Sequence, residues 1–160
     1  MAATTTPSIS SLVKRLQVDF SDYSFVAGER FAWNPVENTV YYQKDGEVSR
    51  LLHELGHATL HHQSYRRDVE LVRMEADAWH TAHELAANYA VPLPDEHVEA
   101  HMDTYREWLH ARSTCPKCET TGLQITEDRY QCPECFATWR VNEARTCGLK
   151  RYTESKNAPS

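Results

Sequence analysis

The sequence lacks any apolar run that approaches the length of a membrane-spanning helix, so nothing in it is expected to cross a bilayer. Its first eleven residues are rich in alanine, threonine and serine, and they lack the basic and apolar segments of a secretory signal. No internal repeat is present beyond two short cysteine pairs, and no helix-turn-helix pattern is found. These absences favour a protein of the reducing cytosol with no membrane partner.

Charge is unevenly distributed along the 160 residues, which are enough for one full domain or for a smaller domain with an appendage. The net charge is −6; residues 1–110 hold nine Lys and Arg against seventeen Asp and Glu, whereas residues 111–160 hold eight against six. The acidic first part argues against a broad phosphate-binding surface there. The second part is too weakly basic for its charge alone to indicate nucleic-acid binding.

Hydrophobic periodicity predicts an α+β fold, with a first domain in residues 1–111. Stretches with helical spacing alternate with stretches rich in aromatic and β-branched residues. In chain order, the predicted elements are a helix at 8–17, strands at 23–33 and 39–43, and helices at about 47–62, at 68–89 and from Pro94 onward.

The most informative motif lies in the fourth of these elements, the helix at about 47–62: His53-Glu54-Leu55-Gly56-His57. Residues four apart share one face of a helix, so His53 and His57 can hold a single metal ion. Glu54 lies beside them, where it can reach a metal-bound water without being a ligand. Gly56 is a poor helix former, which favours a close approach of another backbone or of a substrate at this point. The pattern predicts a catalytic zinc site of a hydrolase.

A catalytic zinc site usually has three protein ligands, so two histidines leave one to be found. Metzincins would need Gly and His at the positions of Leu60 and Gln63, which excludes that solution. Gluzincins take a Glu from a later helix instead. The helix at 68–89 offers five candidates: Glu70, Glu75, Asp77, His80 and Glu84.

Glu75 is the preferred third ligand, because it falls in the middle of the apolar stripe of its helix. A carboxylate there is costly unless a metal or a cation receives it. Glu84 is the second choice, because Asn88 lies one turn later and could support it.

Two segments, 53–61 and 75–79, together resemble the ImmA/IrrE-like metallopeptidases, which are intracellular gluzincins of bacteria, phages and mobile elements. The resemblance covers about residues 20–95 and implies a small zincin-like domain whose sheet precedes the metal helix. It also implies a specific protein substrate, since several members cleave a DNA-bound repressor. The family's ligand Glu usually stands where this chain has Arg73, so the ligand shifts to Glu75, moves to Glu84 or is missing.

If the site is complete, zinc lowers the pKa of its water from about 15.7 to near 7, and Glu54 takes the proton and later protonates the leaving amine. The oxyanion needs a further donor, for which His80, His83 and Tyr89 are unranked candidates. The strand at 39–43 could bind an extended peptide by strand addition.

Several other side chains have simpler interpretations. His61 and His62 are expected to continue the metal helix and to support the site rather than ligate the ion. The tryptophans are expected in the core: Trp79, Trp108 and Trp139.

Four of the five cysteines form two Cys-x-x-Cys pairs separated by thirteen residues: Cys115 with Cys118, and Cys132 with Cys135. Without a secretory signal, this spacing predicts metal ligands rather than disulfides. Four thiolates close a tetrahedral site, so a second zinc ion is expected to be structural, in a zinc ribbon at residues 112–148. A redox dithiol would need only one pair. The combination also resembles the SprT-like proteins, whose His-Gly-x-x-Phe segment is absent here.

Two functional hypotheses follow. In the first, the chain is a zinc metallopeptidase whose ribbon docks a protein substrate. In the second, the zincin domain is inactive and the ribbon binds protein or nucleic acid. Glu54 favours the first, since a structural two-histidine site has no use for a base. Four basic residues in and after the ribbon could touch nucleic acid: Arg140, Arg145, Lys150 and Arg151. A solvated surface, followed by a disordered tail at 149–160, is the simpler interpretation.

Overall fold

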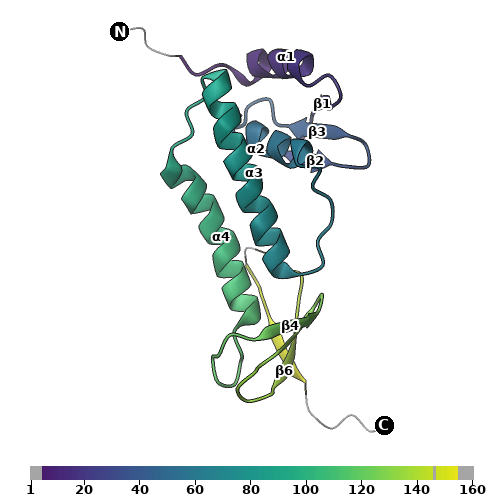
Figure 1. The fold of residues 1–160 in the computed structure, drawn as a ribbon, viewed down its shortest axis with the longest axis vertical. Coiled ribbons are helices and arrows are strands. Elements are labelled where there is room, and N and C mark those ends of the chain that lie inside the picture. Colours follow the sequence, from purple (N-terminus) through teal and green to yellow (C-terminus); the bar gives the residue numbers. More distant parts are fainter. Residues whose placement is uncertain (1–4, 146, 155–160) are drawn as a thin grey trace. The chain divides into compact units, whose positions relative to one another are not determined.

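The computed structural model describes residues 5–145 and 147–154 and has a mixed α+β architecture, which confirms the predicted class (Figure 1). The elements are α1 (Ile9–Asp19), β1 (Ser24–Ala27), β2 (Ala32–Asn34), β3 (Thr39–Tyr42), α2 (Val48–Thr59), α3 (Asp68–Tyr89), α4 (Asp95–Ser113), β4 (Leu123–Thr126), β5 (Arg129–Gln131), β6 (Thr138–Val141) and β7 (Arg151–Glu154).

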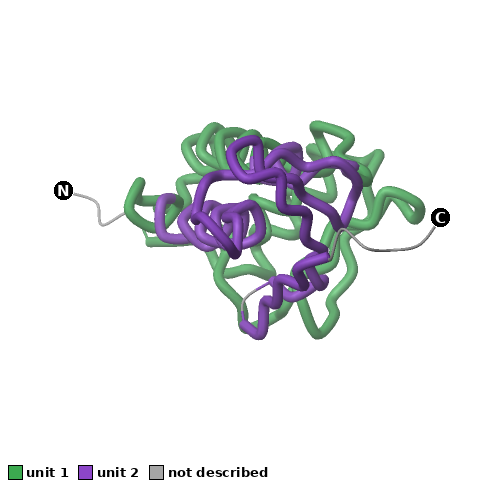
Figure 2. The backbone as a smooth tube through the Cα atoms, turned by 90° about the horizontal axis from the view of Figure 1, so that it is seen from below, with its two compact units in different colours: residues 1–64, 73–98 green, residues 65–72, 99–160 purple. Residues whose placement is uncertain are grey.

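The chain divides into two compact units, which Figure 2 shows in different colours. Unit 1 comprises residues 1–64 and 73–98, and unit 2 comprises residues 65–72 and 99–160. This division differs from the predicted boundary at 111, because the first residues of α3 and most of α4 belong to the unit that holds the cysteines. Within the described part of the chain, no helix combines the length and the apolar character needed to cross a bilayer.

Unit 1 contains a three-stranded sheet in the order β1-β3-β2, in which β3 pairs parallel with β1 and antiparallel with β2. The prediction of a single strand at 23–33 is therefore wrong, because the chain turns at residues 28–31 and returns along the other side of β3. The expectation that the strand at 39–43 would receive a peptide is also wrong, since both edges of β3 are already paired. The edges of this sheet are β1 and β2.

The core of unit 1 forms around α2, whose side chains Leu51, Leu52 and Leu55 are fully buried. These residues recur at helical spacing, so one face of α2 is apolar and lies against β2 and β3. The helix ends at Thr59, earlier than the predicted end at 62, because His61 adopts a left-handed backbone with φ of 55°.

Gly56 lies at a close approach of the backbones of α2 and α3. A Cβ atom added at Gly56 would meet the carbonyl oxygen of Ala78 at 2.5 Å. Any larger residue would push the two helices apart, which is the physical reason for a glycine in the middle of a helix. The predicted close approach of another backbone is thus present, and the backbone is that of α3.

Unit 2 contains a four-stranded antiparallel sheet in the order β4-β5-β6-β7. Its core holds Tyr130 and Trp139, whose rings stack with centroids 5.7 Å apart. Residues 151–154, expected in a disordered tail, instead form β7 and pair with β6; residues 155–160 lie outside the described residues. The three tryptophans expected in the core are buried: Trp79, Trp108 and Trp139.

We expect Gly56→Ala to destabilise unit 1, because a backbone clash can cost up to about 3 kcal/mol, whereas alanine gains only about 1 kcal/mol in helix propensity. Gly28→Ala is the matched control, since its Cβ would meet only Tyr41 Cδ1 at 3.6 Å. Urea unfolding followed by circular dichroism measures both. Equal midpoints for the two variants would show that α2 and α3 can separate without loss.

Candidate metal sites

The two motif histidines lie one turn apart on the buried face of α2. His53 is 7% exposed and His57 is 8% exposed, and their Nε2 atoms are 3.1 Å apart. The rings meet edge to face, with centroids 4.6 Å apart. Both Nε2 atoms therefore point to one place, as two ligands of one ion must.

Glu75 of α3 brings a carboxylate to the same place. Its Oε2 lies 3.0 Å from His53 Nε2 and its Oε1 lies 3.4 Å from His57 Nε2. Ligands bonded to a tetrahedral zinc ion at about 2.0 Å lie about 3.3 Å from one another, so this donor set fits zinc. The three side chains are all buried, and together they form a group that could hold a metal ion.

The ionisation of Glu75 also suits a ligand. Burial by itself would raise its pKa, but the hydrogen bonds and charges of His53 and His57 outweigh burial and hold the pKa of Glu75 far below its usual range. The carboxylate is therefore ionised at neutral pH, and an anionic donor faces two imidazole nitrogens. This is the donor chemistry that a divalent metal ion prefers in a buried site.

Glu54 follows His53 in the chain but lies outside this set. It is half-buried, and its carboxylate makes no hydrogen bond or ion pair with any other described residue. A half-buried carboxylate without a partner among the described residues is available to bind water. The motif requires a general base at this position of the helix.

The alternative third ligands are not members of this buried group. Glu84 is exposed and approaches His80 at 3.9 Å, and Asp77 is also exposed. Glu70 accepts hydrogen bonds from the backbone N–H groups of Arg66 and Arg67, near the start of α3.

Two of the three candidate oxyanion donors are paired with other residues, and the third is exposed. His83 pairs with Asp95 at 3.0 Å, and the Tyr89 hydroxyl donates to Asp19 at 2.5 Å. His80, the remaining candidate, lies exposed on α3. The structure thus brings none of the three to the buried group.

Two further side chains touch the motif histidines: Trp79, which was expected only in the core, and His62, which was expected to support the site. Trp79 stacks on the ring of His53, with centroids 4.1 Å apart. His62 places its Nδ1 atom 2.8 Å from His57 Nδ1, and burial and the nearby His57 lower the pKa of His62. The sequence offers no glycine to mark the end of α2, so the turn that directs His62 back to His57 was not foreseen.

The four paired cysteines meet at one point of unit 2. Sγ of Cys118 lies 3.4 Å from that of Cys132, and Sγ of Cys115 lies 3.6 Å from that of Cys135. Thiolates bonded to zinc at about 2.3 Å lie about 3.8 Å apart, so the set fits a tetrahedral ion with no open position. The fifth cysteine, Cys147, is free and exposed.

Both cysteine pairs have the same local geometry. In each, the residue after the second cysteine has a left-handed backbone, Glu119 with φ of 62° and Phe136 with φ of 59°. The amide of Lys117 donates to Cys115 Sγ at 3.4 Å, and the amide of Glu134 donates to Cys132 Sγ at the same distance. Amides directed at sulfur stabilise thiolates, as metal ligation requires.

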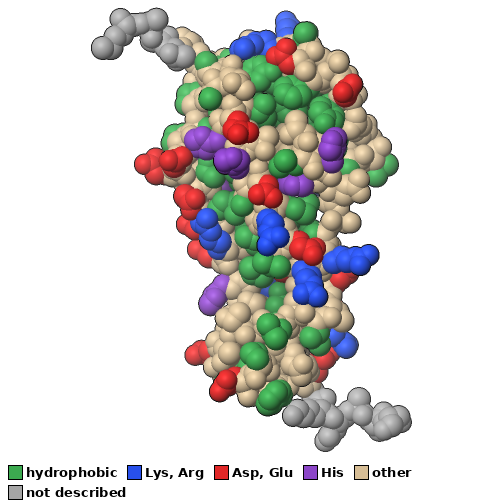
Figure 3. Space-filling view, in the orientation of Figure 1, with side chains coloured by type: hydrophobic (Ala, Val, Ile, Leu, Met, Phe, Trp, Pro, Cys, Tyr) green, Lys and Arg blue, Asp and Glu red, His purple; other side chains and the backbone are tan. Residues whose placement is uncertain are grey.

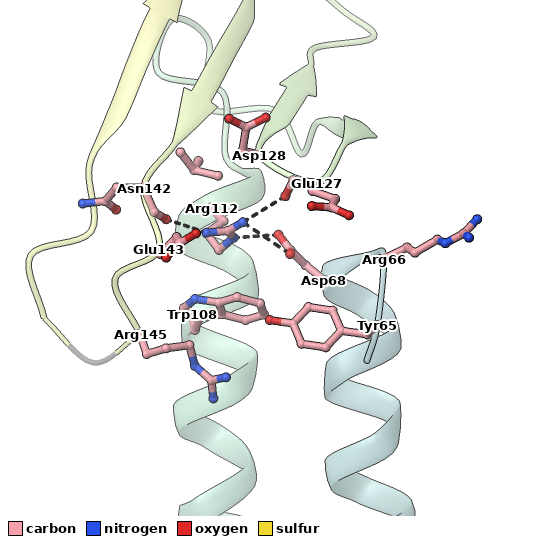
Figure 4. Close-up of a pocket in the computed structure, with 11 residues that line it drawn as sticks. Tyr65, Arg66, Asp68, Trp108, Arg112, Glu127, Asp128, Asn142, Glu143 and Arg145 are labelled. Atoms are coloured by element: carbon pink, nitrogen blue, oxygen red, sulfur yellow. Dashed lines mark hydrogen bonds and ion pairs between the residues drawn. The ribbon is translucent and has the colours of Figure 1, made fainter. Parts of the chain in front are cut away.

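A separate cavity of about 640 Å³ lies within unit 2, and Figure 4 shows the side chains that line it. Arg112 Nε donates to Asp68 at 2.6 Å, and Arg112 Nη1 donates to the Asn142 carbonyl at 2.7 Å. The Tyr130 hydroxyl also donates to Asp68, at 2.5 Å. These buried charges are satisfied by one another, so we assign them to the stability of unit 2 rather than to ligand binding.

Comparisons with protein-family models, curated proteins and solved structures find nothing that matches this chain. The function of the two candidate metal sites therefore rests on their own geometry.

We expect elemental analysis to find two zinc ions per wild-type chain. Glu75→Ala should lower this to about one, because two histidines alone bind zinc weakly, whereas the exposed control Glu84→Ala should retain two. One ion in all three proteins would leave only the cysteine site occupied and would contradict the proposed His53, His57 and Glu75 site.

We also expect Arg112→Met to lower the free energy of unfolding of unit 2 by about 3–5 kcal/mol, since it leaves Asp68 buried without its partner. The control Arg106→Met removes exposed ion pairs with Glu99 and Asp103 and should cost at most about 1 kcal/mol. Thermal unfolding measures both variants. Similar losses in the free energy of unfolding would show that the buried pair stabilises the protein no more than the exposed pairs do.

Proposed function

We propose that this chain is a zinc-dependent endopeptidase of the gluzincin type, which hydrolyses a peptide bond in a specific protein substrate. One observation carries the proposal: His53, His57 and Glu75 form a buried group with zinc-ligand spacing, and Glu54, the next residue after His53, pairs with no other described residue. A purely structural metal site would need a fourth protein ligand, as the cysteine site has. Three ligands and a free carboxylate instead suit a catalytic site.

Each residue has a distinct role in the proposed reaction. A bound zinc ion would supply an acidified water and polarise the scissile carbonyl. Glu54 would take the proton of the attacking water and return it to the leaving amine. Glu75 is already ionised, so it would contribute negative charge that holds the ion between the two histidines.

The sheet of unit 1 offers a place for an extended peptide. Its edge strand β2 (Ala32–Asn34) is paired on one side by β3, and a cavity of about 650 Å³ is lined by residues of β2 and of the preceding turn. Trp33 of this strand donates its indole N–H to the backbone carbonyl of His62, at 2.9 Å. A substrate strand added to β2 would thus run beside the end of α2 that carries the histidines.

The proposed substrate class rests on the resemblance to the ImmA/IrrE-like metallopeptidases. From this resemblance we propose that the substrate is a protein such as a transcriptional repressor. None of the five cysteines forms a disulfide in the structure, and we propose that the protein acts in the cytoplasm. The cysteine ribbon would dock the protein substrate. Nucleic acid is a second possible partner for the ribbon.

A different function is favoured by the surface of unit 2. Hydrophobic side chains reach the surface around the cysteine ribbon (Figure 3): Leu123, Ile125, Phe136 and Tyr152. Exposed large apolar side chains are common at protein-binding surfaces. They support the alternative that the chain is a binding module whose zincin-like part is inactive.

We expect Glu54→Gln to abolish cleavage while zinc content, folding and the binding of partners stay unchanged. The glutamine keeps the size of the side chain but cannot accept the proton. Cells that produce the wild type or the variant are compared by labelling and sequencing new protein N-termini. Peptides released only by the wild type identify the substrate.

Glu84→Gln is the matched control, because it also neutralises a glutamate but lies exposed on α3. It should give the same new N-termini as the wild type. If Glu54→Gln and the wild type produce the same biological effect and the same N-termini, the peptidase proposal is wrong and the binding module is favoured.

A further inference from the structure

The end of α2 has an unusual turn that carries His62 back over the metal helix. The N–H of His62 donates to the carbonyl of His57 at 3.0 Å, and the N–H of His61 donates to that of Ala58 at 3.0 Å. With His61 at φ of 55°, these bonds form a Schellman motif. In this motif the side chains at the positions of His57 and His62 commonly meet through an apolar contact. Here that contact is made by two imidazoles.

The two imidazoles are close enough for a hydrogen bond. Nδ1 of His57 lies 2.8 Å from Nδ1 of His62, so one of these nitrogens must carry the hydrogen and the other must accept it. Nε2 of His57 faces His53 and Glu75, where a metal would take its lone pair. The hydrogen of His57 must then be on Nδ1, and His62 must be the acceptor.

We propose that His62 is a positioning residue, which accepts the Nδ1–H of His57 and so fixes the tautomer and ring orientation that His57 needs to bind the metal. The inference rests on the proposed zinc site and extends it beyond the three ligands. Partners of this kind typically change metal affinity 10- to 100-fold.

His62 and the turn before it are held in place by Trp33 of β2 and by Tyr23, which directly precedes β1. Trp33 donates its indole N–H to the His62 carbonyl at 2.9 Å, and the Tyr23 hydroxyl donates to the carbonyl of Ala58 at 3.3 Å. The rings of Tyr23 and Trp33 meet edge to face, with centroids 5.6 Å apart. A left-handed backbone at a residue other than glycine, such as His61, destabilises the folded state by about 1–2 kcal/mol. These contacts offset that cost.

The two metal histidines are supported differently. Among the described residues, Nδ1 of His53 has no hydrogen-bond partner, and its ring is held by stacking on Trp79. Only His57 has its tautomer set by a hydrogen bond. The effect of His62 should therefore reach the metal through His57.

The test uses the full chain with zinc retained in the cysteine site and Co²⁺ titrated into the site of α2 and α3. Visible absorption of Co²⁺ reports both affinity and coordination geometry. We expect His62→Leu to weaken Co²⁺ binding 10- to 100-fold and to alter the spectrum. His62→Asn should restore affinity to within a few-fold of the wild type, because its side-chain oxygen can replace Nδ1 as the acceptor.

His61→Asn is the matched control: His61 is exposed, and asparagine tolerates its left-handed backbone. Its Co²⁺ affinity should equal that of the wild type. Should His62→Leu fail to fold, Trp33→Phe removes the donor that holds His62 and is expected to weaken Co²⁺ binding several-fold. Trp33→Phe with wild-type affinity would then count against the proposal.

Three outcomes decide the matter. If His62→Leu keeps the wild-type Co²⁺ affinity and spectrum, the role of His62 is overturned but the metal site is not. The same conclusion holds if His62→Asn loses as much Co²⁺ affinity as His62→Leu. A wild-type protein that binds Co²⁺ no better than Glu75→Ala overturns the metal site itself, and with it the role of His62.

Discussion

The close approach of α2 to α3 at Gly56 is the constraint on which the candidate metal site depends. Glu75 and Ala78 lie one turn apart on α3, so the contact between Gly56 and the Ala78 carbonyl also sets how far Glu75 lies from the histidines. A side chain at Gly56 would separate the helices, and the carboxylate would move away from His53 and His57. One missing Cβ atom thus permits the buried group to form.

Burial makes this group costly unless its charges are balanced. An ionised carboxylate enclosed in the protein is destabilising without a cation or hydrogen-bond donors, and Glu75 faces two imidazole nitrogens. A divalent ion would balance the carboxylate and use both nitrogens. The same reasoning separates the two candidate metal sites: four thiolates complete a tetrahedron, whereas two histidines and one glutamate leave a position for a reacting molecule.

Sequence periodicity was most informative where one face of an element is buried. The bounds predicted for α3 match the structure, and α1 and α2 differ only at their ends, because apolar residues at helical spacing mark a buried face. The segment at 23–33 differs from its prediction, since a turn without a strong sequence pattern splits it into β1 and β2. The strand β7 was missed because four residues without clear alternation pair with β6 only in the folded sheet.

The sequence by itself determined the candidate groups: the two histidines and the proposed base Glu54 of one motif, and the four cysteines of two pairs. These sets are local, and helix or turn geometry places neighbours in the chain side by side. Glu75 was favoured over Glu84 by its place in an apolar stripe, but only the packing of α2 on α3 decided which carboxylate meets the histidines. Tertiary structure alone decided that His62 contacts His57, because a helix ending without glycine depends on bonds from Trp33 and Tyr23, which lie far away in the sequence.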